Sequence, residues 1–220
     1  MAYILSLETS TTNCSVSVSK KGQLMSIKEL NNASYSHAES LHVFISEVLN
    51  QANIESSDLE AIAVSKGPGS YTGLRIGVSA AKGLCYALDI PLISISTLKS
   101  LALQLRIEDG FIVPMLDARR MEVYSAIFDP DFNLIRKIEA QIIDENSFLK
   151  ELEETQLNFI GSGVEKCKNV ISHNNAKFID NKFPSSKQMA ELAYGKLLNN
   201  EIEDLAYFEP FYLKDFLISK

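Results

Sequence analysis

The sequence predicts an α/β protein built from two related subdomains. Residues 3–30 alternate three strand-like segments with two turns, and residues 111–143 repeat that order. In both regions the strands are followed by segments in which apolar residues recur with helical spacing. Because a repeated order of elements is typical of a duplicated domain, we expect a boundary near residue 106, which gives the subdomains 1–105 and 106–220.

Composition and charge narrow the class of protein. Of the 220 residues, 46% are hydrophobic and 22% are charged, which is ordinary for a globular chain with a sizeable core. The formal net charge is -7 at pH 7 and the isoelectric point is about 5.1. Phosphate contacts need clustered lysine and arginine, so we do not expect the chain to hold nucleic acid by itself.

Three features predict a cytoplasmic protein without a membrane span. The N-terminus has no basic start and reaches Glu8 early, unlike a signal peptide. No window of about eighteen uncharged apolar residues could cross a bilayer. Cys14, Cys85 and Cys167 are odd in number and far apart, so they predict reduced thiols rather than disulfides or a zinc site.

The first subdomain is expected to contain five strands and three helices. In the second strand Cys14, Val16 and Val18 share one face and serines share the other. Residues 36–52 carry apolar side chains in a wide helical stripe. The expected strands are 3–8, 14–19, 24–30, 59–65 and 91–97, and the expected helices are 36–52, 72–88 and 98–105.

The second subdomain is expected to begin after Glu108-Asp109-Gly110, where the pattern starts again. Its first strand ends in an acid, Asp117, as the first strand of the chain ends in Glu8. The expected strands are 111–117, 121–128 and 134–143, and the expected helices are 144–154, 164–173 and 186–199.

The stretch KGPGSYTGLRIG, residues 66–77, connects a strand to a helix and could hold a phosphate there. It fails the P-loop pattern, since Leu74 and Arg75 follow Gly73, and it fails G-x-G-x-x-G, since Thr72 replaces a glycine. A helix N-terminus can still attract an anion. Turn geometry and packing are the favoured interpretation of these glycines, and Arg75 should have an acid or a carbonyl oxygen as its partner.

The helix that follows is apolar over most of its circumference, which indicates burial on two sides. One side can pack on the parent sheet, and two glycines on the other would let a second helix approach closely. Together with the stripe of the preceding helix, this predicts a partner interface formed by Leu41, Phe44, Ile45, Val48, Gly73, Gly77, Ala80 and Leu84.

The residues that could carry chemistry are few. His37 and His42 lie five positions apart on one helix, whereas helical metal pairs lie four apart, and His173 is expected at a helix end. No G-x-S-x-G elbow supports a serine hydrolase. We therefore predict no catalytic residue and no metal site. Glu8 and Asp117, at strand ends, leave one enzymatic alternative: an actin-fold nucleotide hydrolase or kinase using both acids and the 66–77 loop.

Four segments resemble the TsaB (YeaZ) family, a bacterial partner subunit in the synthesis of threonylcarbamoyladenosine in tRNA. They are LSLETSTTNCSVSV, KGPGSYTGLRIGVSAAKGL, MLDARRMEVYSAIF and EPFYLK, spread from residue 4 to residue 214. The family is related to TsaD, which binds its metal through two histidines four apart on a helix. This chain has SHAESLH in the comparable region, so it departs from TsaD and is similar to TsaB.

The resemblance implies two actin-like (ASKHA) subdomains, each with a mixed sheet that opens with an antiparallel meander. It implies a non-catalytic scaffold that activates a TsaD-like catalytic subunit beside a TsaE-like ATPase and forms a homodimer when alone. Within the family the two helices of the first subdomain form the interface. Contact with tRNA would come only through the complex, and no resident cofactor is implied. An ATP or ADP at the complex interface stays open.

Overall fold

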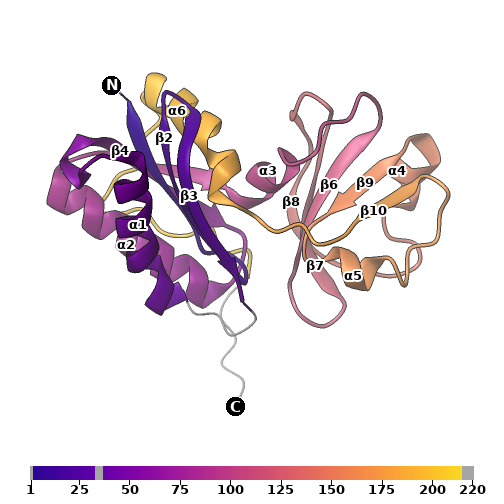
Figure 1. Cartoon of the computed structure of the whole chain (residues 1–220). Helices are drawn as coiled ribbons and strands as arrows, with labels where there is room; N and C mark the ends of the chain where they lie inside the picture. Colours follow the sequence, from indigo (N-terminus) through magenta and orange to yellow (C-terminus); the bar gives the residue numbers. More distant parts are fainter. Residues whose placement is uncertain (1, 33–36, 215–220) are drawn as a thin grey trace, which may run out of the picture. The chain divides into compact units, whose positions relative to one another are not determined.

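The computed structural model describes residues 2–32 and 37–214 (Figure 1). The chain divides into two compact units. Unit 1 comprises residues 1–100 and 184–220, and unit 2 comprises residues 101–183. This division differs from the expected subdomains, because the chain returns to unit 1 after residue 183.

A five-stranded mixed sheet forms the centre of unit 1. Its strand order is β3-β2-β1-β4-β5. The pairs β1–β2 and β2–β3 are antiparallel, whereas β1–β4 and β4–β5 are parallel. The strands are β1 (Tyr3–Glu8), β2 (Asn13–Lys20), β3 (Gln23–Asn31), β4 (Leu59–Gly67) and β5 (Leu92–Ser96).

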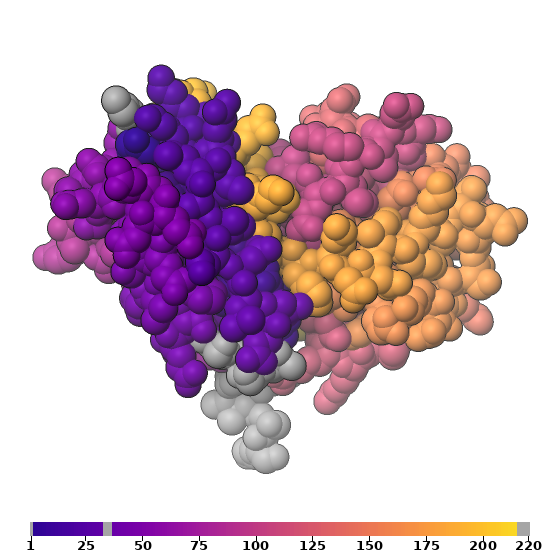
Figure 2. Space-filling view, viewed as in Figure 1, coloured from indigo at the N-terminus to yellow at the C-terminus, as the bar shows by residue number. Residues whose placement is uncertain are grey.

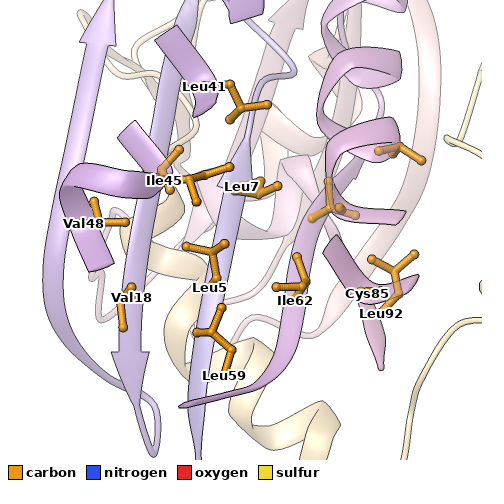
Figure 3. Packing of buried hydrophobic residues seen from close by; sticks show 14 of the residues in the cluster. Leu5, Leu7, Val18, Leu41, Ile45, Val48, Leu59, Ile62, Cys85 and Leu92 are labelled. Atoms are coloured by element: carbon orange, nitrogen blue, oxygen red, sulfur yellow. The ribbon is translucent and has the colours of Figure 1, made fainter. Parts of the chain in front are cut away.

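Two helices cover one face of this sheet. They are α1 (His37–Ala52) and α2 (Tyr71–Leu88), and both were expected from apolar periodicity. Leu5 and Leu7 of β1 point toward them, and Leu41, Ile45 and Val48 of α1 complete the same core (Figure 3). The core of unit 1 thus lies between the sheet and these helices. A short η1 (Ser56–Asp58) follows α1, and α3 (Thr97–Ala102) follows β5.

The opposite face of the sheet is covered by η2 (Ser186–Gln188) and α6 (Met189–Leu198). Ile4 and Ala61 of the sheet pack there against Met189 and Ala193. The serine face of β2 is also buried, because Ser15, Ser17 and Ser19 are each 0% exposed. Ser15 Oγ and Ser186 Oγ lie 2.8 Å apart, and Ser17 Oγ donates to Ser186 O at 3.1 Å. These contacts explain why residues 184–214 belong to unit 1 rather than to unit 2.

Unit 2 repeats the topology of unit 1. Its strand order is β10-β9-β6-β7-β8, with antiparallel pairs β6–β7 and β7–β8 and parallel pairs β6–β9 and β9–β10. Its elements are β6 (Phe111–Asp117), β7 (Glu122–Phe128), β8 (Leu134–Ile142), α4 (Leu149–Glu154), β9 (Leu157–Ile160), α5 (Val164–Cys167) and β10 (Ala176–Ile179). Two mixed sheets of the same order confirm the predicted α/β fold class.

The later part of unit 2 differs from the sequence prediction. The strands β9 and β10 were not expected, α4 begins five residues later than predicted, and α5 ends at Cys167. Phe159 of β9 is fully buried, and its ring packs 5.2 Å from Phe148 and 5.1 Å from Phe178. These strands, LNFI and AKFI, are only four residues long, too short for periodicity to distinguish a strand from a helix. None of the described helices has the length and apolar character of a membrane span.

Candidate functional site: the glycine-rich loop and the outer helices

The glycine-rich loop joins β4 to α2 and packs against the turn between β1 and β2. Ser70 caps α2, since its Oγ accepts a hydrogen bond from Gly73 N at 3.3 Å. The amide of Ser70 donates to Ser10 O at 2.7 Å. Thr9 Oγ1 donates to Gly73 O at 2.7 Å. The loop therefore binds a segment of its own unit.

The glycines of this loop make room for Thr9 and Ser10. A Cβ atom on Gly69 would collide with Ser10, and one on Gly73 or Gly77 would collide with Thr9. Thr9 and Ser10 are each 1% exposed. Carbonyl oxygens of this turn thus lie against the start of α2, the end of a helix that attracts anions. The glycines serve packing, as favoured from the sequence, and Gly73 and Gly77 do not open α2 to a partner helix.

The structure also buries the predicted interface residues of α1 in their own unit. Leu41 and Val48 are 0% exposed and Ile45 is 7% exposed. Three further residues are partly buried against the same core: Phe44, Ala80 and Leu84. The physical reason is that an apolar helical stripe first packs on the sheet of its own domain. Spacing in the sequence does not distinguish that stripe from a partner surface.

The outer faces of α1 and α2 present other residues. Val43 of α1 is 52% exposed, and α1 lies at the surface of unit 1 in Figure 2. On α2 the exposed side carries Ser79 and Gly83. Among the residues that the structure describes, none has an atom within 4 Å of a Cβ built on Gly83. The described part of unit 1 therefore does not cover these positions.

Glu8 is buried at the end of β1. It is 0% exposed, and its Oε1 accepts a hydrogen bond from Ser10 N at 2.7 Å. Burial raises the pKa of this carboxyl above its ordinary value, and the hydrogen bonds from Ser10 and Ser65 only partly oppose that effect. Burial therefore makes ionisation of this carboxyl less favourable than in water.

Asp117, at the end of β6, is exposed but already paired. Its Oδ1 accepts hydrogen bonds from Lys166 Nζ at 2.6 Å and from Arg119 N at 2.6 Å. The amide of Asp117 donates to Ser162 Oγ at 3.1 Å. This carboxylate therefore shapes a turn and neutralises a lysine.

The histidines and cysteines are not grouped. His37 is buried, and its Nε2 lies 2.7 Å from Thr11 O. Burial lowers the pKa of His37, whereas His42 is exposed. His173 does not lie at a helix end, since α5 stops at Cys167. Over residues 2–32 and 37–214, no three His, Cys, Asp or Glu side chains gather where they could hold a metal ion.

Residues 204–214, near the C-terminus, pack along α2, a contact that no sequence pattern predicted. Lys82 Nζ donates to the carbonyls of Ala206 at 3.1 Å and Phe208 at 3.2 Å. Arg75 Nε donates to Tyr212 Oη at 3.2 Å. The partner of Arg75 is thus a tyrosine, not the expected acid or carbonyl. We call this segment the strap.

The strap also reaches the glycine-rich loop. Phe211 N donates to Lys66 O at 2.7 Å. The ring of Tyr212 lies 5.0 Å from that of Tyr71, and the Arg75 guanidinium lies 4.1 Å from the centre of the Tyr71 ring. The EPFYLK motif, residues 209–214, therefore fastens the start of α2.

Comparisons with known proteins agree with this architecture. The model of the family described as "TsaD: tRNA N6-adenosine threonylcarbamoyltransferase" matches residues 31–218. The tRNA threonylcarbamoyladenosine biosynthesis protein TsaB of Bacillus subtilis is 35% identical over 177 residues, which cover 77% of this chain and 76% of that protein. TsaB of Haemophilus influenzae is 29% identical over 224 residues, which cover 96% of this chain and 93% of that protein.

A solved structure shows the same fold. YeaZ from Pseudomonas aeruginosa superposes with a TM-score of 0.82 at 24% identity, covering 97% of this chain and 100% of that one. This likeness confirms the actin-like arrangement of two mixed sheets. The two sequence relatives cover 77% and 96% of the chain and supply the functional class. The chain belongs to the TsaB (YeaZ) family of tRNA threonylcarbamoyladenosine biosynthesis proteins.

Proposed function

We propose that this chain is a non-catalytic subunit that activates a TsaD-like transferase. It would support the transfer of a threonylcarbamoyl group to the adenosine beside the anticodon of tRNA. A TsaE-like ATPase would be a further partner, and the chain would pair with itself when alone. Contact with tRNA would occur in the complex.

The observation that supports a non-catalytic role is the state of the two strand-end acids. Glu8 is buried with a raised pKa, and Asp117 is paired with Lys166 at 2.6 Å. The glycine-rich loop is filled by Thr9 and Ser10. Of the groups that a nucleotide hydrolase would use, Glu8 is thus buried away from solvent, and Asp117 and the loop are engaged within their own units.

The outer face of α1 and α2 is the proposed surface for the transferase or for a second copy. Val43 is exposed there, and Gly83 leaves open space beside the α2 backbone. Phe44, Ala80 and Leu84 of the predicted interface are partly buried and border this face. A helix of a partner could approach α2 closely at Gly83.

The test of function is reconstitution followed by mass spectrometry of digested tRNA. Adding the purified chain to the transferase, the ATPase and the threonylcarbamoyl donor should raise the yield of threonylcarbamoyladenosine. Depleting the chain in cells without a paralogue should lower it. An unchanged yield in both experiments would remove the proposal.

A measurement of ATP turnover distinguishes the proposed scaffold from the alternative, a nucleotide hydrolase or kinase. The isolated chain with Mg²⁺ should hydrolyse ATP no faster than a buffer control. Turnover that Glu8→Gln abolishes would replace the scaffold proposal with a nucleotide hydrolase.

The surface is tested with Gly83→Leu. Leucine favours a helix by about 1 kcal/mol over glycine, and a Cβ at this position has no described neighbour within 4 Å, so the fold should persist. Association with the transferase, measured by size-exclusion chromatography with light scattering, should weaken. Undiminished association would place the interface elsewhere.

A further inference from the structure

The turn between β6 and β7 holds two adjacent arginines in an uncommon backbone conformation. Arg119 has a φ of 68° and Arg120 has a φ of 46°. Residues with a Cβ atom rarely adopt this left-handed region, and glycine or asparagine is the usual choice in such turns. Neither position carries one of these residues.

Lys166 of α5 fixes this turn through hydrogen bonds from its ammonium group. Its Nζ donates to Asp117 Oδ1 at 2.6 Å, to Arg120 O at 2.7 Å and to Glu122 O at 3.1 Å. Arg119 N donates to Asp117 Oδ1 at 2.6 Å. Lys166 itself is only 15% exposed. The arginine side chains therefore project from a turn whose backbone is fixed.

The positive charge of the two arginines is not compensated locally. Both residues are exposed, and within the described part of the chain neither guanidinium has a hydrogen-bond or ion-pair partner. The nearby acids are engaged, since Asp117 pairs with Lys166 and Glu165 pairs with Lys168 at 2.7 Å. The chain has a net charge of -7, yet this turn presents two adjacent, unpaired cationic side chains on a fixed backbone.

We propose that Arg119 and Arg120 contact the phosphate backbone of the RNA substrate when the chain is in its complex. This rests on the proposed function, which brings tRNA to the complex. A guanidinium matches phosphate oxygens with two parallel donors, and a fixed turn loses little freedom on binding. An acidic chain repels RNA over most of its surface, so contact is favoured where positive charge is free.

The experiment compares two double variants in the assembled complex. Arg119→Gln with Arg120→Gln removes the proposed contact. Lys20→Gln with Lys21→Gln is the matched control, because it removes two adjacent cations from the β2–β3 turn, where Lys21 also has a positive φ of 50°. Both variants change the net charge equally. Melting curves verify that each variant folds.

Binding of tRNA to the transferase complex is measured over a salt series. Each phosphate contact contributes about 0.7 to 0.9 to the slope of log K against log salt. The arginine variant should lose about 1.4 to 1.8 of slope and bind tRNA several-fold more weakly, whereas the lysine variant should match the wild type. Equal slopes for all three proteins would overturn the inference.

Two other results can be distinguished from loss of an RNA contact. If the arginine variant fails to join the transferase while assembled complexes bind tRNA normally, the turn contacts an acidic protein surface and the inference is wrong. If the wild-type chain adds nothing to the transferase, the proposed function fails together with the inference. If only the arginine variant shows a smaller slope of log K against log salt, the result supports both the proposed function and the inference about the two arginines.

Discussion

Gly77 shows most directly how a residue's environment decides its role. It lies in the interior of α2, and a Cβ atom there would collide with Thr9 Oγ1 of the same unit. Thr9 is also the donor to Gly73 O at 2.7 Å. The absence of a side chain at position 77 thus permits the β1–β2 turn to seat against α2.

We predict that Gly77→Leu destabilises the isolated chain. Overpacking of a filled site costs about 1 to 3 kcal/mol, and a chain of this size loses about 2 to 4 °C of melting temperature per kcal/mol. Gly83→Leu is the matched control, since it makes the same change on the exposed side of the same helix. Calorimetry should show a lower melting temperature for Gly77→Leu alone. Equal melting temperatures would contradict the packing described here.

Glu8 gives a prediction about pH. Burial raises the pKa of this carboxyl in the folded state above its ordinary value of 4.5. The folded state therefore binds more protons than the unfolded state above that pH. The stability that this group contributes is fully present below about pH 4.5 and is lost as the pH rises through the folded pKa.

Glu8→Gln should therefore be more stable than the wild type at neutral pH. The amide is uncharged at every pH and can keep the acceptor for Ser10 N. The difference in free energy of unfolding should grow as the pH rises from 4.5, measured by urea titration at a series of pH values. Glu39→Gln, on the exposed side of α1, controls for the loss of one negative charge. A constant difference would show that Glu8 ionises normally.

Among the elements, α2 is fixed in place by two sets of contacts, one with the sheet and one with the strap. Val78, Ala81 and Cys85 are buried on the sheet side. The strap binds another side through Arg75 and Lys82. The side of α2 that carries Ser79 and Gly83 is covered neither by the sheet nor by the strap. The position of α2 therefore depends on residues more than 120 positions away in the sequence.

Removing the aromatic anchor should loosen the strap without unfolding unit 1. Tyr212→Ala removes the acceptor of Arg75 and the ring beside Tyr71. Hydrogen exchange should become faster at Phe211 N, which donates to Lys66 O, and stay unchanged in α1. Tyr207→Ala is the control, because that side chain is 84% exposed. Unchanged exchange in both variants would mean that Tyr212 does not anchor the strap.

At the scale of the whole molecule, net charge is the property that bears on the proposed contact with tRNA. The net charge is -7, and Arg119 and Arg120 of unit 2 are two adjacent exposed cations in a predominantly acidic chain. Two phosphate contacts provide little affinity at physiological salt. Binding therefore requires surfaces supplied by partners.

The isolated chain should bind tRNA weakly. A gel shift at physiological salt should show no complex at micromolar protein, because even ordinary non-specific binders have dissociation constants of about 10⁻⁴ to 10⁻⁶ M. The transferase complex, assayed in parallel, should shift the same tRNA. Submicromolar binding by the chain alone would reveal a basic surface that the described residues do not show.

Much of the fold followed from the sequence because local patterns suffice where elements are long. The helices α1 and α2, with 16 and 18 residues, have enough turns for apolar periodicity to be clear. The repeated strand order identified two related units with the same sheet topology. The failure of both phosphate motifs also favoured packing as the role of the glycine-rich loop.

The tertiary structure decided which surface each residue meets. Gly77 and Gly83 are both glycines of α2, yet one faces Thr9 and the other faces open space. The return of the chain to unit 1 at Pro184, the strap on α2 and the pairing of Asp117 with Lys166 also join residues distant in sequence. Periodicity reports that a helix has an apolar side. Only the three-dimensional packing of distant segments determines whether that side is covered by its own domain or left for a partner.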